Sequence, residues 1–83
     1  MKKILYLTLN RKWFDKIATG EKKIEYRDIK PYWIKRVEHK NYDEVYFRNG
    51  YQKNSPFMRV KYEGYKKTNR YELKLGIILE IKY

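Results

Sequence analysis

The sequence predicts a small, mainly β domain with two short helices (α+β), arranged as a small and mostly antiparallel β-barrel. Several segments alternate apolar and polar residues, as half-buried strands do, and the longest alternation covers residues 71–83. Two apolar stripes at helical spacing occur in the first half of the chain. A length of 83 residues leaves room for a single domain over residues 1–83. An open α+β sheet is the alternative arrangement.

The first strand and the first helix are the clearest elements. Residues 4–9 form a short apolar run that predicts a strand. Asn10 then suits the N-cap of a helix over residues 11–19, and Gly20 stands where a left-handed C-terminal residue belongs. The predicted apolar face of this helix consists of Trp13, Phe14 and Ile17.

The next segment, residues 22–27, changes to the two-residue period of a strand. Successive strand residues point to opposite faces, so Glu25 and Arg27 share one face. We expect Ile24 and Tyr26 to anchor the other face in the core. Charged side chains would then be presented by a rigid element.

A second helix and two further strands follow. Pro31 suits the first turn of a short helix. Residues 42–47 alternate as a strand and lead to the turn dipeptide Asn49-Gly50. Residues 57–63 read as a strand that Gly64 closes.

The C-terminal part begins with a basic connector over residues 65–70. The last alternation, residues 71–83, is long for one strand, so Gly76 is expected to mark a bend or bulge.

The charge of the chain points to a polyanionic partner. There are 21 Lys and Arg against 10 Asp and Glu, a formal net charge of +11 that is spread along the whole sequence. A folded domain with this excess attracts polyanions, and nucleic acid is the first partner to consider.

Composition also narrows the kinds of site and location. The chain has no Cys and one His, which excludes a disulfide framework, a thiolate zinc site and a multi-histidine metal site. We therefore predict no cofactor and no metal, and a reducing, cytoplasmic location. The apolar stretches are far shorter than the roughly 20 residues of a membrane span, and residues 1–9 lack the cleavage site of a signal peptide.

One short segment combines residues that could carry chemistry. Glu25 and Arg27 share a strand face, and a bulge after Gly20 would bring Lys22 to the same side. The simpler interpretation is a solvated ion pair worth at most about 1 kcal/mol. If Glu25 or Lys22 were buried, the two could instead perform acid-base work.

The same segment resembles a known family. Gly20-x-Lys22-x-x-Glu25-x-Arg27 matches the GxKxxExR signature of the ASCH domain, a PUA-like β-barrel. Residues 28–33 and 47–51 are also similar to small bacterial and phage-type members, and the resemblance covers roughly residues 4–62. It implies a cleft between barrel and helices, lined here by Lys22, Glu25 and Arg27, that binds RNA or a modified nucleotide.

The chemistry of these residues suits such a ligand. Arg27 can grip a phosphate or stack on a base, Lys22 offers a point charge, and Glu25 can accept from exocyclic amino groups or orient Arg27. Aromatic side chains at the rim can stack a base, although Trp33 and Tyr26 more often belong to a core. The aromatic candidates are Tyr26, Tyr32, Trp33 and Tyr51.

The Asn49-Gly50-Tyr51 segment and the basic residues around it are further candidates. Asn49 and Tyr51 either form a plain turn or stand at the cleft mouth. Neighbouring cations are either a solvated face or a track for the backbone of a single strand. These cations are Arg48, Lys53, Arg59 and Lys61.

Two other functions stay open. Some ASCH-type proteins resemble hydrolases of acylated cytidine or are linked to RNA cleavage, so Lys22 and Glu25 could act on RNA or a modified nucleoside. The acyl-cytidine branch has a Thr nucleophile where this chain has Glu25, which disfavours that reaction. The small size and phage-type resemblance also fit a protein that binds a host factor.

Overall fold

The computed structural model describes residues 2–50, 52 and 54–83, which form five strands and two helices. In chain order these are β1 (Ile4–Thr8), α1 (Arg11–Ala18), β2 (Ile24–Arg27), α2 (Pro31–Val37), β3 (Glu44–Arg48), β4 (Phe57–Lys67) and β5 (Tyr71–Lys82).

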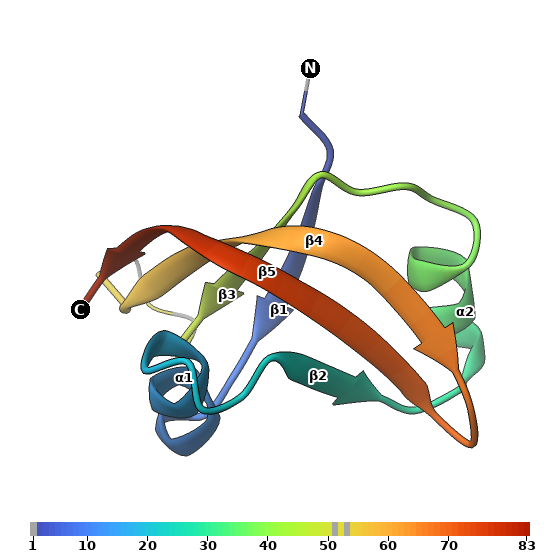
Figure 1. Ribbon diagram of the computed structural model, residues 1–83, viewed down its shortest axis with the longest axis horizontal. Helices are drawn as coiled ribbons and strands as arrows, with labels where there is room; N and C mark the ends of the chain where they lie inside the picture. The colour runs from blue at the N-terminus through green and yellow to red at the C-terminus, as the bar shows by residue number, and fades with distance from the viewer. Residues whose placement is uncertain (1, 51, 53) are drawn as a thin grey trace.

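All five strands belong to one sheet with the order β1-β3-β4-β5-β2. The β1–β3 pair is parallel and the other three pairs are antiparallel. The long strands β4 and β5 arch over the molecule, so the sheet curls into a half-barrel with α1 and α2 at its two ends (Figure 1). The predicted class, mainly β with two short helices, is confirmed.

The hydrophobic core fills the inside of this curl. Side chains from all strands except β2 meet there with residues of both helices. The fully buried ones include Leu5, Phe14, Val37, Val45, Phe47, Met58, Val60, Tyr71 and Leu73.

The helix α1 begins and ends as the sequence predicts. The Asn10 Oδ1 accepts a hydrogen bond from the Trp13 N–H at 3.1 Å, and Gly20 has a φ of +84°. Phe14 and Ile17 are buried, but Trp13 is 38% exposed. The prediction that Trp13 shares the buried face is therefore wrong, because Trp13 lies at the edge of the stripe that faces the core.

The strand β4 is longer than predicted. Pairing with β5 continues past Gly64 to Lys67, so residues 65–67 belong to a hairpin and the predicted connector is wrong there. Gly64 has a φ of +95° and lies in a register shift between Tyr62 and Tyr65. A glycine that ordinarily ends a strand is used here as a bulge, which bends the strand without ending it.

The strand β5 changes character at Gly76. The pairs of Val60 with Ile78 and of Tyr62 with Leu75 enclose a register shift at this glycine, which confirms the predicted irregularity. The alternating side chains are buried up to Leu75, whereas Ile77 is 68% exposed. The sequence pattern alone did not reveal that the core ends there.

Candidate functional site

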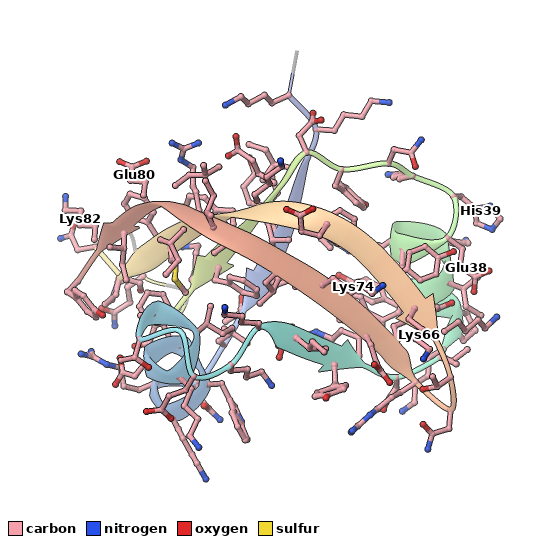
Figure 2. All side chains as sticks on the ribbon, viewed as in Figure 1. Glu38, His39, Lys66, Lys74, Glu80 and Lys82 are labelled. Carbon is pink, nitrogen blue, oxygen red and sulfur yellow. The ribbon has the colours of Figure 1, made fainter. Side chains whose placement is uncertain are left out.

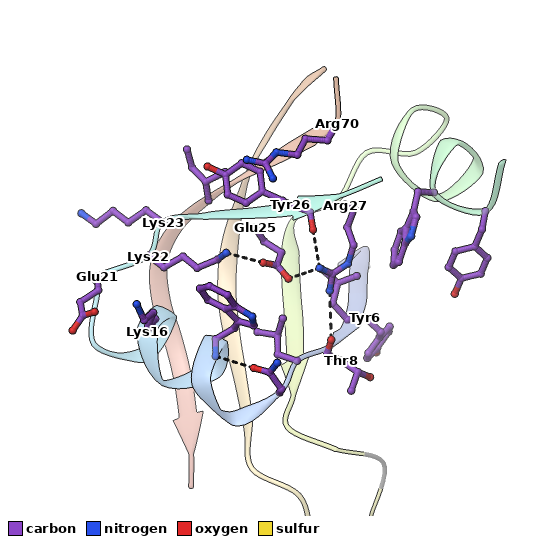
Figure 3. Close-up of a pocket in the computed structure, with 18 residues that line it drawn as sticks. Tyr6, Thr8, Lys16, Glu21, Lys22, Lys23, Glu25, Tyr26, Arg27 and Arg70 are labelled. Carbon is purple, nitrogen blue, oxygen red and sulfur yellow. Dashed lines mark hydrogen bonds and ion pairs between the residues drawn. The ribbon is translucent and has the colours of Figure 1, made fainter. Parts of the chain in front are cut away.

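A cleft of about 1290 Å³ opens where the half-barrel does not close. One wall comes from β1 and the start of α1, the other from the α1–β2 loop and β2, and α2 and the β4–β5 hairpin tip border it (Figure 3). The charged lining residues are Lys16, Glu21, Lys22, Lys23, Glu25, Arg27 and Arg70.

The pairing of β2 with β5 determines which side chains point inward. Glu25 lies opposite Leu73 and Arg27 opposite Tyr71, and both of these partners are fully buried. Directly opposed residues share a face of the sheet, so the two charged side chains of β2 point to the core side.

This arrangement overturns one prediction. Ile24 and Tyr26 do point to the other face of β2 from Glu25, but Ile24 is paired with Lys74, so this is the outer face and not the core. Lys74 is exposed (Figure 2). Glu25 is the buried residue of the strand, with 4% of its surface exposed. The expectation that Ile24 and Tyr26 anchor the core is wrong, because a charged cluster occupies that place.

The cluster is centred on the Glu25 carboxylate, and each oxygen has a cation. The Lys22 Nζ lies 3.2 Å from Oε1, and the Arg27 Nη1 donates to Oε2 (Figure 3). Arg27 also donates to the Tyr26 carbonyl at 2.9 Å and, from Nη2, to the Thr8 carbonyl at 3.4 Å. The last bond joins β2 to β1 across the cleft.

The turn after α1 brings Lys22 to the same side as Glu25. The left-handed Gly20 reverses the chain, and the Lys22 N–H donates to the Lys16 carbonyl at 3.0 Å. Lys22 precedes β2, so it does not have to obey the alternation of the strand.

This geometry assigns different tasks to the three residues. Both Glu25 oxygens accept from cations, so the carboxylate orients Lys22 and Arg27. The side chains of Lys22 and Arg27 keep 16% and 18% of their surface exposed, which leaves N–H groups toward the cleft. With five basic and two acidic lining residues, the cleft is positively charged.

Aromatic rings surround the charged cluster. Trp13, Tyr6 and Tyr32 are exposed at the cleft and present ring surface to a ligand. Trp33 is more enclosed, with the guanidinium carbons of Arg27 and Arg36 at 5.2 and 5.7 Å from its ring centre.

Two of the predicted site residues do not line the cleft. Asn49 donates from its side chain to the Leu9 carbonyl and from its backbone to the Pro56 carbonyl, which is a structural turn. Arg48 donates to the Gln52 carbonyl at 2.6 Å. Tyr51 and Lys53 lie outside the described residues.

Arg59, one of the cations of the candidate basic track, is instead bound to a second buried carboxylate, Glu44. Its oxygens lie 2.8 Å from the Lys2 Nζ and 2.7 Å from the Arg59 Nη1, and Arg59 also binds Glu80 at 2.9 Å. Hydrogen bonds from Lys2 and Arg59 hold the pKa of Glu44 below its usual value of 4.5. Arg59 therefore forms ion pairs with two carboxylates of the protein itself. Lys61 is exposed.

Sequence reasoning missed Trp13 and Arg70 as cleft residues. Arg70 stands at the tip of the β4–β5 hairpin, and its guanidinium carbon lies 3.8 Å from the Tyr26 ring centre (Figure 3). No local pattern reveals this contact, because it depends on the hairpin that extends past Gly64. For Trp13, the nearby Lys12 and Lys16 were the feature of the sequence that indicates a charged surface and not the core.

In the part of the chain that the structure describes, no three His, Cys, Asp or Glu side chains lie close enough together to hold a metal ion. The helices in residues 2–50 and 54–83 are too short to cross a membrane. Comparison of the chain with protein-family models, curated proteins and solved structures found no match.

Proposed function

We propose that this chain is a nucleic-acid-binding module whose cleft between β1 and β2 takes RNA or a modified nucleotide. One observation carries the proposal: a buried carboxylate holds two cations at the inner side of a sheet, within a positively charged cleft lined by aromatic rings.

The energetics of buried charge support a functional role for this cluster. Replacing a buried ion pair by apolar residues of similar volume is often neutral or stabilising, so stability alone gives little reason to keep charges there. Cations fixed by a buried carboxylate are suited to binding phosphate, because their side chains are already ordered.

The form of the cleft favours a single strand over a duplex. The helices α1 and α2 have 8 and 7 residues, about 12 Å or less in length, too short to read a major groove. Exposed rings beside cations are the combination by which proteins bind unpaired bases and their phosphates.

The ASCH-type resemblance is consistent with this proposal. Its four signature residues, Gly20, Lys22, Glu25 and Arg27, all line the same cleft. We propose on this basis that the chain is an ASCH-type, PUA-like domain.

The test is fluorescence anisotropy of labelled single-stranded RNA over a salt series, followed by a check that the RNA is intact. Four or five phosphate contacts predict a log-log slope of about −3 for a single strand. No binding at low salt, or binding that salt leaves unchanged, would contradict the proposal.

A hydrolase acting through Lys22 and Glu25 is the second candidate. The 3.2 Å contact between the Lys22 Nζ and the Glu25 Oε1 inside the cleft favours it. It predicts cleaved RNA or a deacylated nucleoside, with turnover abolished in both Lys22→Ala and Glu25→Gln. Intact substrate in every such assay would count against it.

A further inference from the structure

Trp13 is placed unusually for a residue of an amphipathic helix. Its neighbours Phe14 and Ile17 are buried in the core, whereas 38% of the Trp13 surface is exposed and the ring lines the cleft. A large aromatic ring left partly in water forgoes burial energy. An exposed ring inside a charged cleft therefore points to a ligand that covers it.

Three ammonium groups surround the Trp13 ring. The Nζ atoms lie 4.5 Å from the ring centre for Lys22, 5.1 Å for Lys12 and 5.6 Å for Lys16. These lysines come from the helix and from the loop that follows it. An aromatic platform with cations around it can stack a base while the cations hold the phosphates on either side.

Trp33 provides the contrast within the same cleft. Its ring lies near the guanidinium groups of Arg27 and Arg36 and has an edge contact with Tyr32 at 4.9 Å between ring centres. It also packs against the hydrophobic core. Trp33 is thus partly buried against the core, and of the two tryptophans Trp13 is the more exposed at the cleft.

We infer that Trp13 stacks an unpaired base while Lys12, Lys16 and Lys22 bind the adjoining phosphates. This inference rests on the proposed function and narrows the ligand to single-stranded nucleic acid. Duplexes and polyanions without bases cannot use the Trp13 ring, so they bind through charge alone.

Single-tryptophan variants test the inference directly, because the chain has two tryptophans. Trp33→Phe leaves Trp13 as the reporter, and Trp13→Phe leaves Trp33. Unlabelled single-stranded RNA of about 12 nucleotides is expected to change the emission of Trp33→Phe strongly and that of Trp13→Phe little. Inorganic polyphosphate, which has no base to stack, is expected to change the emission of Trp33→Phe much less than RNA does.

Affinity provides the second readout. Stacking contributes about 1–3 kcal/mol per base, so Trp13→Ala is expected to weaken RNA binding roughly 5- to 150-fold. Trp13→Phe should lose less affinity than Trp13→Ala, because Phe still offers a ring that can stack on a base. Circular dichroism and thermal unfolding establish that each variant is folded, which the partial exposure of Trp13 favours.

The outcomes separate the two proposals. RNA that binds Trp33→Phe by anisotropy without changing its emission, or an unchanged affinity in folded Trp13→Ala, would overturn the stacking inference and leave the nucleic-acid function standing. Wild-type protein that binds no RNA in the anisotropy assay would overturn both.

Discussion

Glu25→Gln is the change that most directly perturbs the charged cluster. The substitution keeps the shape of the side chain but replaces one carboxylate oxygen by an NH₂ group. That group would face either Lys22 or Arg27, whose cations lie against the two oxygens. One cation then meets a donor, and neither meets a negative charge.

The burial of the three side chains sets the size of the effect. Removing one partner of a buried ion pair costs about 3–5 kcal/mol when the remaining charge is fully desolvated. Lys22 and Arg27 keep 16% and 18% of their side-chain surface exposed, so water relieves part of this cost. We therefore expect a loss of about 2–3 kcal/mol in the free energy of unfolding, less than for a fully desolvated charge.

Urea unfolding and calorimetry measure this loss. For a domain of this size, about 1 kcal/mol corresponds to roughly 4–8 °C in Tm, so a fall of about 10–20 °C is expected. The matched control is Glu21→Gln, the same substitution at an exposed residue of the same cleft, which should change stability by less than about 0.5 kcal/mol. Equal, small effects of both variants would refute the inference that Glu25 holds the cations.

Three further predictions concern the cluster and the fold. Replacing all three charges at once, as Lys22→Met, Glu25→Leu and Arg27→Met, should leave stability near that of the wild type while RNA binding is lost; strong destabilisation would mean that the cluster serves the fold. Gly64→Ala should lower the unfolding free energy by about 1–2 kcal/mol because φ is +95° there, whereas no effect in urea unfolding would show that the bulge tolerates a side chain. The pKa of Glu44 is lowered by hydrogen bonds from Lys2 and Arg59, so its contribution to stability is present above pH 4.5 and is lost as the pH falls further. The difference in stability between the wild type and Glu44→Gln should therefore shrink below pH 4.5, and a difference constant down to pH 3 would contradict this assignment.

Most of the fold follows from local signals in the sequence. The N-cap Asn10, the helix start at Pro31 and the strand that begins at residue 57 are each determined by neighbouring residues, and all were predicted. Errors arose where tertiary pairing decides the outcome. Gly64 reads as a strand end, yet pairing with β5 continues past it, because a bulge absorbs its left-handed backbone.

The site was only partly predicted, again because tertiary pairing decides where its side chains point. Spacing showed that Glu25 and Arg27 share a face, but whether that face points to the core or to solvent depends on which residues of β5 lie opposite them. Arg70 and Trp13 join the cleft only through the hairpin and the rotation of α1 about its axis. Spacing in the sequence specifies neither.

RNA affinities of two charge-matched double variants test the central claim that the cleft, and not net charge, binds nucleic acid. Lys22→Gln with Arg70→Gln removes two cations from the cleft, and Lys74→Gln with Lys82→Gln removes two exposed cations of β5 that do not line it (Figure 2). We expect the cleft variant to lose at least about tenfold in affinity and about 1.4 in salt slope, with the other variant close to the wild type. Equal losses in both variants would show that the positive charge binds RNA without a site.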